Sequence, residues 1–239
     1  IMINVNKLEF KTFPGGELHI TDAWTKNGDI LSDQTVLCRI KCSDDLMKLC
    51  LFTDAYKRLT GRMPCRLILP YIPYARQDRV ANPGEALSIK VFANIINSLG
   101  YKQVIVLDPH SDVSTAVIEN VRIVPQWNIF SDCIQEGVDL ISPDAGALKK
   151  IYKLQQAVAE KGIQVPVRTA TKHRDTQTGF ISGTTLDGEA VNKTCVVVDD
   201  ICDGGGTFLA LANTLKEQYE KCILMVTHGI FSKGLDELS

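Results

Sequence analysis

The sequence lacks the features of several specialised protein classes. No run approaches the roughly 18 consecutive apolar residues of a transmembrane helix, so we expect no association with a membrane. Neither sign of charge dominates, because 26 basic and 28 acidic side chains give a formal net charge of −2. A dedicated nucleic-acid binder would carry a basic excess, and we expect none here. The first residues, IMINVNKLEFKTF, lack the basic and apolar regions of a signal peptide, which favours a cytoplasmic protein.

The eight cysteines follow no metal-binding or disulfide pattern. No CxxC pair occurs, and no cysteine pair stands beside a suitably spaced histidine pair, which argues against a structural zinc site. Most of the cysteines lie in apolar runs such as TVLCRI, where a thiol acts as a small hydrophobic side chain. With 239 residues and 45% hydrophobic content, the chain can bury a core without disulfides. We therefore expect the cysteines to be reduced.

Short apolar segments alternate with longer segments of helical pattern along the whole chain. Several short segments are apolar on successive residues, as expected for parallel strands covered on both faces. This alternation predicts an α/β protein with mostly parallel sheets. Ser43 is the expected N-cap of the first helix. The expected strands are 35–40, 66–72, 103–108, 138–143, 194–200 and 222–228, and the expected helices are 44–60, 86–99, 144–161 and 206–220.

The two halves of the chain show a similar order of elements. The clearest pair of corresponding segments is QVIVLDPH and TCVVVDD, in which an apolar strand ends in acidic residues or histidine. In open α/β sheets, ligands bind outside the carboxyl ends of the strands. We therefore look for chemistry at these two strand ends, and we expect a boundary between the halves near residues 125–135.

The most informative segment is VVVDDICDGGGTF, residues 196–208. Three consecutive glycines leave the backbone N–H groups free to turn toward a ligand, and the helix that follows favours an anion at its N-terminus. Thr207 can donate a hydroxyl hydrogen bond, and Asp199 and Asp200 can hold ribose hydroxyls or a hydrated magnesium ion. An ordinary glycine-rich turn flanked by solvated acids is the alternative. The acidic pair and the threonine beside an apolar strand favour the binding loop.

This segment resembles the loop that binds phosphoribosyl diphosphate (PRPP) in type I phosphoribosyltransferases and in PRPP synthetases, the ribose-phosphate pyrophosphokinases. Two further segments distinguish the families, because PYIPYARQDR (70–79) and FPGGE (13–17) resemble the ATP-site motifs of PRPP synthetases. LDPH, SPDAG and KHR also match motifs of that family, in the same order. The resemblance covers residues from about 10 to 232 and identifies the chain as a member of the PRPP synthetase family.

The resemblance implies two tandem phosphoribosyltransferase-type I-like domains, residues 1–128 with the ATP-site motifs and residues 129–239 with the catalytic and ribose-phosphate loops. It implies Mg²⁺-dependent transfer of the β,γ-diphosphoryl group of ATP to the anomeric hydroxyl of ribose 5-phosphate, which releases AMP. It also implies a homo-oligomer, a dimer or larger. Catalysis of such an in-line displacement is mainly positioning and charge neutralisation.

The resemblance assigns a role to each matching residue. Lys172 and Arg174 lie in TKHRDTQTG, whose polar composition predicts a mobile loop, and their cations would stabilise the charge gathered at the β-phosphorus. His110 is implied as a catalytic residue, an ATP contact and a metal ligand, and Asp144 as a second metal ligand, a ribose contact or a helix N-cap. The implied ATP-binding residues are Phe13, Gly16, Glu17, Arg76, Gln77, Asp78 and His110. The implied ribose-phosphate-binding residues are Asp199, Asp200, Asp203, Gly204, Gly205, Gly206 and Thr207.

Two departures from the family pattern bear on specificity. The stretch VANPGEALSIK lacks the basic residues usual there, which predicts that inorganic phosphate is not a required activator. Gly204 stands where the family loop has a threonine that helps to bind the 5-phosphate, and Gly205 removes the next side chain. A wider floor of the acceptor pocket would admit a larger acceptor such as ADP-ribose. Backbone amides and the helix N-terminus can instead replace the lost hydroxyl, and this alternative keeps ribose 5-phosphate as the preferred acceptor.

Two other classes of function fit the sequence less well than an active pyrophosphokinase. A non-catalytic regulatory homologue would be expected to lose the catalytic loop, whereas this chain keeps Lys172 and Arg174. A phosphoribosyltransferase that consumes PRPP would not account for PYARQDR.

Overall fold

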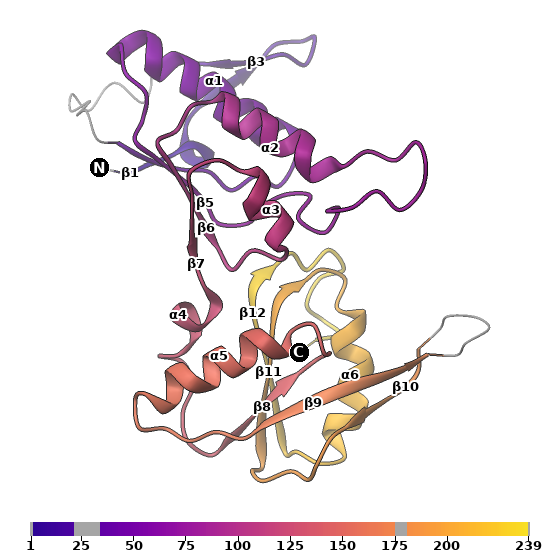
Figure 1. Cartoon of the computed structure of the whole chain (residues 1–239). Helices are drawn as coiled ribbons and strands as arrows, with labels where there is room; N and C mark the ends of the chain where they lie inside the picture. Colours follow the sequence, from indigo (N-terminus) through magenta and orange to yellow (C-terminus); the bar gives the residue numbers. More distant parts are fainter. Residues whose placement is uncertain (1, 22–33, 175–180, 239) are drawn as a thin grey trace. The chain divides into compact units, whose positions relative to one another are not determined.

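The computed structural model describes residues 2–21, 34–174 and 181–238, with the side chains of 172–183 excepted. The chain divides into two compact units, Ile1–Val124 and Pro125–Ser239 (Figure 1). The sequence places the boundary after residue 128, which lies inside the short helix α4 (Gln126–Phe130). The units divide four residues earlier because strand β7 (Val121–Val124), which the sequence analysis did not predict, completes the first sheet.

Unit 1 is built around a parallel sheet of five strands in the order β1–β4–β5–β6–β7. A separate antiparallel hairpin, β2–β3, carries the FPGGE segment at its turn. The elements of unit 1, besides β7, are β1 (Met2–Asn4), the 3₁₀ helix η1 (Val5–Lys7), β2 (Phe10–Thr12), β3 (Leu18–Ile20), β4 (Thr35–Leu37), α1 (Ser43–Thr60), β5 (Arg66–Leu69), α2 (Ser88–Ser98), β6 (Gln103–Leu107) and α3 (Asp112–Val117).

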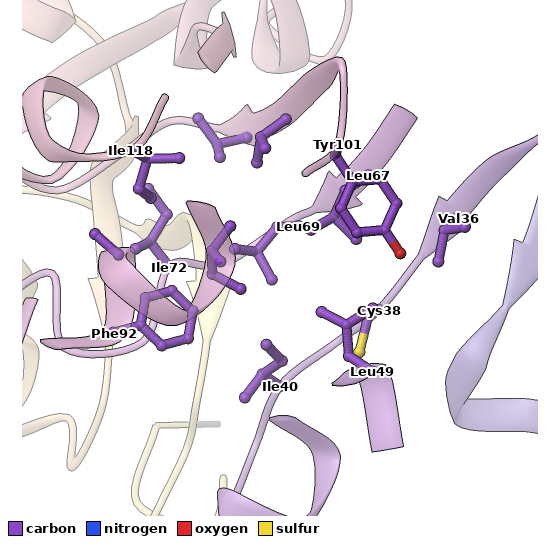
Figure 2. Close-up of a cluster of buried hydrophobic side chains, with 14 of the residues drawn as sticks. Val36, Cys38, Ile40, Leu49, Leu67, Leu69, Ile72, Phe92, Tyr101 and Ile118 are labelled. Carbon is purple, nitrogen blue, oxygen red and sulfur yellow. The ribbon is translucent and has the colours of Figure 1, made fainter. Parts of the chain in front are cut away.

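The core of unit 1 forms where helices α1 and α2 meet the sheet. Alternate residues of the central strands are buried, as the period of two in a strand requires, and Leu67 and Leu69 of β5 are fully enclosed. They pack with Leu49 of α1 and Phe92 of α2 in a single apolar cluster (Figure 2). The Tyr101 hydroxyl, which is also buried here, lies 2.8 Å from the Thr53 hydroxyl and so keeps a hydrogen-bond partner.

Unit 2 has a mixed sheet in the order β10–β9–β8–β11–β12. Only β10 runs antiparallel to its neighbour, and the other three pairings are parallel. The α/β fold with mostly parallel sheets is therefore confirmed. The elements of unit 2, besides α4, are β8 (Val138–Ser142), α5 (Leu148–Ala159), β9 (Val167–Arg174), β10 (Ile181–Leu186), β11 (Thr194–Cys202), α6 (Gly206–Lys216) and β12 (Lys221–Gly229).

Two separate apolar clusters cover the two faces of the unit 2 sheet. Val196 and Val198 of β11 point to the face covered by α5, where they join Ile151. Cys195 and Val197, on the opposite face of the same strand, join Leu211 of α6. A strand buried on both faces must be apolar on successive residues, which explains the uninterrupted run TCVVV in the sequence.

A hydrogen-bonded network closes the amino-terminal ends of the unit 2 strands. The buried Arg168 guanidinium of β9 donates to the Tyr219 hydroxyl at 2.6 Å, and that hydroxyl donates to Asp139 Oδ2 of β8 at 2.8 Å. Arg168 also donates to Gln218 and to the backbone carbonyls of Asp187 and Gly188. Because every charged group in the network is paired, its burial carries little penalty.

The strands and helices expected from the sequence agree with the structure in position, but some of their ends differ. Each expected strand and helix is present, with ends that differ by up to four residues. Ser43 is not an N-cap, because α1 begins at Ser43 and is preceded by Cys42, which makes no side-chain cap. The Asp45 carboxylate instead reaches back to accept the N–H of Lys41 at 3.0 Å, and so it binds a backbone donor at this helix end. Within the described residues, no helix is long and apolar enough to cross a membrane.

Candidate functional site

The FPGGE segment forms the tight turn of the β2–β3 hairpin in unit 1. The backbone N–H of Phe13 bonds to Glu17 at 2.9 Å, and the N–H of Gly16 bonds back to Phe13 at 2.8 Å. Gly16 has a φ of 90°, a left-handed value that other residues rarely adopt. The Phe13 ring is 40% exposed and lies 5.0 Å from Lys11 Nζ. The turn therefore presents an aromatic face, which can stack on a planar base, beside the carboxylate of Glu17.

The PYIPYARQDR segment follows strand β5 as a compact turn. Tyr74 has a φ of 64°, unusual for a residue with a Cβ, and its carbonyl accepts the N–H of Gln77 at 2.9 Å. The Tyr74 ring rests 6.0 Å from the Phe92 ring of α2, which holds the strained turn in place. Arg76 and Gln77 are exposed on this turn. A ligand in the solvent could therefore reach both side chains.

The LDPH segment forms a second turn of unit 1, at the carboxyl end of β6. Asp108 is buried with a φ of 36°, and its N–H bonds to Val124 at 2.8 Å. This turn leads to the exposed His110 and then to Ser111, whose hydroxyl donates to Asp78 Oδ2 at 2.5 Å. The hydrogen bond joins the two turns, so the structure brings Asp78 and the residue next to His110 together. Ser111 is a contact residue that no sequence motif marks.

Two neighbouring carboxylates lie near the carboxyl end of β11 in unit 2. Strand β11 continues to Cys202. Asp199 and Asp200 therefore lie within the last residues of the strand and not beyond its end. Asp200 is buried and pairs with Lys150 Nζ of α5 at 2.9 Å. Burial, followed by the negative charges of Asp200 and Asp144, raises the pKa of Asp199 to about 7. An acid whose pKa lies near neutrality marks a functional-site candidate.

Asp144 follows the neighbouring strand β8 and lies near enough to act on Asp199 electrostatically. Its Oδ1 accepts the backbone N–H groups of Gly146 at 3.0 Å and of Ala147 at 3.2 Å. Helix α5 begins only at Leu148, with Ala147 as its N-cap, so Asp144 stabilises the preceding turn and is not the N-cap.

The glycine loop, residues 203–207, connects β11 to helix α6. Gly205 has a φ of 75° and allows the chain to turn sharply into the helix. Gly206 opens α6, and a Cβ there would meet nothing within 4 Å, so the backbone at this position is open to a ligand. Thr207 lies half-buried in the first turn of α6. The loop thus offers backbone N–H groups and a hydroxyl at a helix N-terminus, which suits a phosphate.

The segment after β12, residues 230–238, lies across the glycine loop. The N–H groups of Ile230 and Ser232 bond to Cys202 at 2.8 Å and to Asp203 at 3.2 Å. The Ser232 hydroxyl also donates to Asp203 Oδ1 at 2.6 Å. A Cβ built on Gly204 would lie 3.5 Å from Lys233 Cε, and one on Gly205 would lie 3.2 Å from Leu238. The space expected to widen the acceptor pocket beside these two glycines is therefore occupied by Lys233 and Leu238.

Lys172 and Arg174 were expected in a loop, and the structure places their backbone in strand β9. Lys172 pairs with Thr184 of β10, and Arg174 pairs with Ile181. The two residues thus form the end of a hairpin arm, and the prediction that they lie in a loop is wrong. Residues 175–180, which complete the expected loop, lie outside the described part of the chain, as do the side chains of Lys172 and Arg174.

The two expected metal ligands belong to different units, His110 to unit 1 and Asp144 to unit 2. Among the described residues, no group of three or more His, Cys, Asp and Glu side chains is arranged to hold a metal ion. None of the eight cysteines, all of which lie in the described part of the chain, forms a disulfide. Asp144 and Asp199, near the carboxyl ends of β8 and β11, interact electrostatically, whereas Asp200 is paired with Lys150.

Comparisons with known proteins match both units. The family model for the N-terminal domain of ribose phosphate pyrophosphokinase matches residues 1–100, and that for the phosphoribosyl transferase domain matches residues 127–228. A ribose-phosphate pyrophosphokinase of Mycoplasma genitalium is 31% identical over 98% of this chain and 70% of its own length. Ribose-phosphate pyrophosphokinase 4 of Saccharomyces cerevisiae is 31% identical over 89% of this chain and 65% of its own.

A solved structure shares the fold across both units. The crystal structure of phosphoribosylpyrophosphate synthetase from Mycobacterium smegmatis aligns with a TM-score of 0.73 and 25% identity. The alignment covers 93% of this chain and 72% of that one.

Proposed function

Because the chain belongs to the ribose-phosphate pyrophosphokinase family, we propose that it makes PRPP and AMP from ATP and ribose 5-phosphate. In this reaction the anomeric oxygen of the ribose forms a bond to the β-phosphorus of ATP. The bond from the β-phosphorus to the bridging oxygen of the α-phosphate breaks, and AMP leaves with that oxygen. The proton of the anomeric hydroxyl is released.

The observation that carries the proposal for the acceptor is the glycine loop beside two carboxylates at the end of β11. Asp199 and Asp200 offer oxygens that can accept hydrogen bonds from the ribose hydroxyls. The glycine loop offers N–H groups at the start of an 11-residue helix, where a phosphate is favoured by the helix dipole. One sugar phosphate can use both features, because its hydroxyls and its phosphate lie at opposite ends of the molecule.

The three turns of unit 1 support the proposal for ATP. Phe13 provides an aromatic face for the adenine, and Glu17 lies in the same turn. Arg76 provides a planar cation, whose guanidinium can donate two parallel hydrogen bonds to a phosphate. Gln77 and His110 add further polar contacts, and Asp78 joins their two turns through Ser111.

The family implies a divalent metal ion, and the chemistry of unit 2 suits Mg²⁺. Burial raises the pKa of Asp199, and the negative charges of Asp200 and Asp144 add to it, so a cation between Asp144 and Asp199 would offset part of this charge. Mg²⁺ is usually held by one or two carboxylates together with substrate phosphates and water, and it needs no cage of three side chains. When bound, it would neutralise charge on the diphosphoryl group. His110, the other residue that the resemblance implies as a metal ligand, belongs to unit 1 and is proposed to bind a metal ion there together with ATP.

Lys172 and Arg174 are proposed to act on the reacting phosphorus. Their positions at the end of the β9–β10 arm are compatible with a segment that closes over substrate. Two cations placed there would stabilise the charge that gathers in the transition state. A homo-oligomer, as the family resemblance implies, is proposed as well, and sedimentation velocity would measure it. Inorganic phosphate is proposed not to be a required activator.

The proposed reaction is tested by phosphorus NMR of a mixture of the protein, ATP, Mg²⁺ and ribose 5-phosphate. We expect signals of AMP and of an anomeric diphosphate to grow at equal rates, because each turnover makes one of each. ADP as the main product would show a simple kinase instead. No turnover, with ATP still bound, would favour a regulatory homologue.

A matched pair of variants links the product to the proposed site. Asp200→Asn should abolish AMP formation, because it weakens both the ribose contact and the ion pair with Lys150. Lys193→Ala should leave the rate unchanged, because Lys193 pairs with Glu220 on the surface, where both side chains are mostly exposed. Circular dichroism of both variants would show whether the fold is retained.

A further inference from the structure

Lys233 lies against the glycine loop that the proposed function assigns to the acceptor phosphate. Three methylene carbons of its side chain, Cγ, Cδ and Cε, lie 3.5–3.8 Å from the position of a Cβ on Gly204. The ammonium group is attached to Cε, the nearest of the three. A lysine stem therefore occupies the place that a side chain at position 204 would take.

The backbone of Lys233 lies in a segment that is anchored on both sides, and its side chain is exposed. Residues 230–232 continue from the last pairing of β12, Cys202 with Gly229, and bond to the loop through the N–H groups of Ile230 and Ser232. The Ser232 hydroxyl adds a third bond, to Asp203. On the other side of Lys233, Leu238 packs into the apolar cluster beneath α6 and lies against Gly205. Lys233 is thus held between two anchored points of the same segment.

The side chains near the glycine loop are mostly acidic, so a bound phosphate would need a nearby positive charge. The acidic residues at the carboxyl ends of β8 and β11, Asp144, Asp199, Asp200 and Asp203, would repel a phosphate dianion. Lys150 is already bound to Asp200 at 2.9 Å. Lys233, in contrast, takes part in none of the ion pairs formed between described side chains. Its side-chain carbons lie beside Gly204, so it brings a positive charge close to the loop.

We propose that Lys233 is a specificity-determining residue that binds the terminal phosphate of the sugar-phosphate acceptor beside Gly204. The inference rests on the proposed function, because it concerns the same acceptor site. A phosphate monoester carries up to two negative charges, whereas an internal phosphate of ADP-ribose carries one. A cation at this point favours the monoester, and the lysine stem beside Gly204 narrows the pocket that a larger acceptor would need.

The main variant is Lys233→Met, which keeps an unbranched apolar stem over Gly204 and removes the charge. We expect the KM for ribose 5-phosphate to rise about 10- to 100-fold, because a hydrogen bond to a charged group is lost. The KM for ATP and kcat should stay within about threefold, since the interaction is equal in the ground and transition states. Lys233→Arg should restore most of the affinity, which loss of packing alone would not allow. Lys193→Ala is the matched control for removing a lysine charge.

Calorimetric binding of ribose 5-phosphate gives a readout that does not depend on turnover. The wild-type protein should bind it with an affinity that falls steeply with added salt, and Lys233→Met should reduce both the affinity and that salt dependence. The ratio of kcat/KM for ribose 5-phosphate to that for ADP-ribose should also fall in Lys233→Met.

The outcomes separate this inference from the proposed function. If the wild type forms AMP but Lys233→Met keeps its KM and its calorimetric affinity within twofold, the role of Lys233 is wrong and the reaction stands. If the wild type binds ribose 5-phosphate through Lys233 without forming AMP, the reaction is wrong and the inference stands. If the wild type does not bind ribose 5-phosphate, both are wrong. A higher efficiency with ADP-ribose than with ribose 5-phosphate would also overturn the inference.

Discussion

The two units place polar residues at the ends of parallel strands in different ways. In unit 1, Arg76, Gln77 and His110 are exposed on two turns that the Asp78–Ser111 hydrogen bond holds together. In unit 2, Asp199 and Asp200 lie in β11 itself, and burial, followed by the negative charges of Asp200 and Asp144, raises the pKa of Asp199.

The difference indicates two kinds of task. Exposed side chains on turns can adapt to a ligand, and they cost the fold little when no ligand is bound. Carboxylates crowded into the end of a buried strand cost stability until a cation or a hydrogen-bond donor arrives. We therefore propose that unit 1 recognises the nucleotide and that unit 2 carries the chemistry and binds the acceptor.

The largest expected effect tests whether unit 2 carries the chemistry. Lys172→Ala and Arg174→Ala should each lower kcat by about 100- to 1000-fold, because they remove a cation that acts mainly in the transition state. Steady-state kinetics at saturating ATP would measure this, with Lys193→Ala as the control. A raised KM with an unchanged kcat would show that these residues act in ground-state binding. It would contradict the proposal that unit 2 carries the chemistry.

An intermediate effect tests whether unit 1 recognises the nucleotide. Arg76→Ala should raise the KM for ATP by about 10- to 100-fold, since a charged hydrogen bond to a phosphate is lost, and should leave the KM for ribose 5-phosphate unchanged. Arg58→Ala, which removes another exposed arginine of the same unit, is the control. If Arg76→Ala raised only the KM for ribose 5-phosphate, unit 1 would bind the acceptor and not the nucleotide.

The smallest expected effect concerns the stability of unit 2 without ligands. The folded state holds the Asp199 proton up to about pH 7, whereas the unfolded chain releases it near pH 4. Folding therefore takes up a proton between these values, and this carboxyl lowers the free energy of unfolding as the pH rises through that window. Asp199→Asn should abolish this loss.

Urea denaturation in the presence of a chelator would measure the effect at pH 5 and pH 8. We expect the stability advantage of Asp199→Asn over the wild type to grow by about 1–2 kcal/mol between these pH values, discounted for partial solvent screening. Asp44→Asn, at an exposed acid of α1, is the control. A constant difference across the range would show that Asp199 is not electrostatically crowded in solution.

The central strands and the glycine loop could be predicted from the sequence because their signals are local. TCVVV must be buried on both faces, and DGGGT must turn sharply before the helix. The β9–β10 arm could not be predicted in the same way. Only Val167–Thr169 pair with β8, and the rest of β9 has β10 as its one neighbouring strand in the described chain. Such an arm tolerates TKHR, whose polar composition favours a loop.

The missed site residues depend on contacts between distant segments. Ser111 meets Asp78 across 33 residues, and Lys150 meets Asp200 across 50. Lys233 reaches Gly204 only because the segment after β12 returns over the loop. No local pattern marks any of these residues, since serine and lysine are common on surfaces.

The Arg168–Tyr219–Asp139 network lies at the opposite end of the unit 2 strands from the carboxylates. A laboratory evolution campaign could therefore treat the two ends of this sheet as separate objectives. Substitutions around the amino ends of the strands would change the thermal stability of the protein. Substitutions around the carboxyl ends would change its specificity for the acceptor. Stabilising substitutions at the amino ends would offset destabilising substitutions at the carboxyl ends. New acceptor specificities should therefore be easier to obtain from a thermostabilised parent.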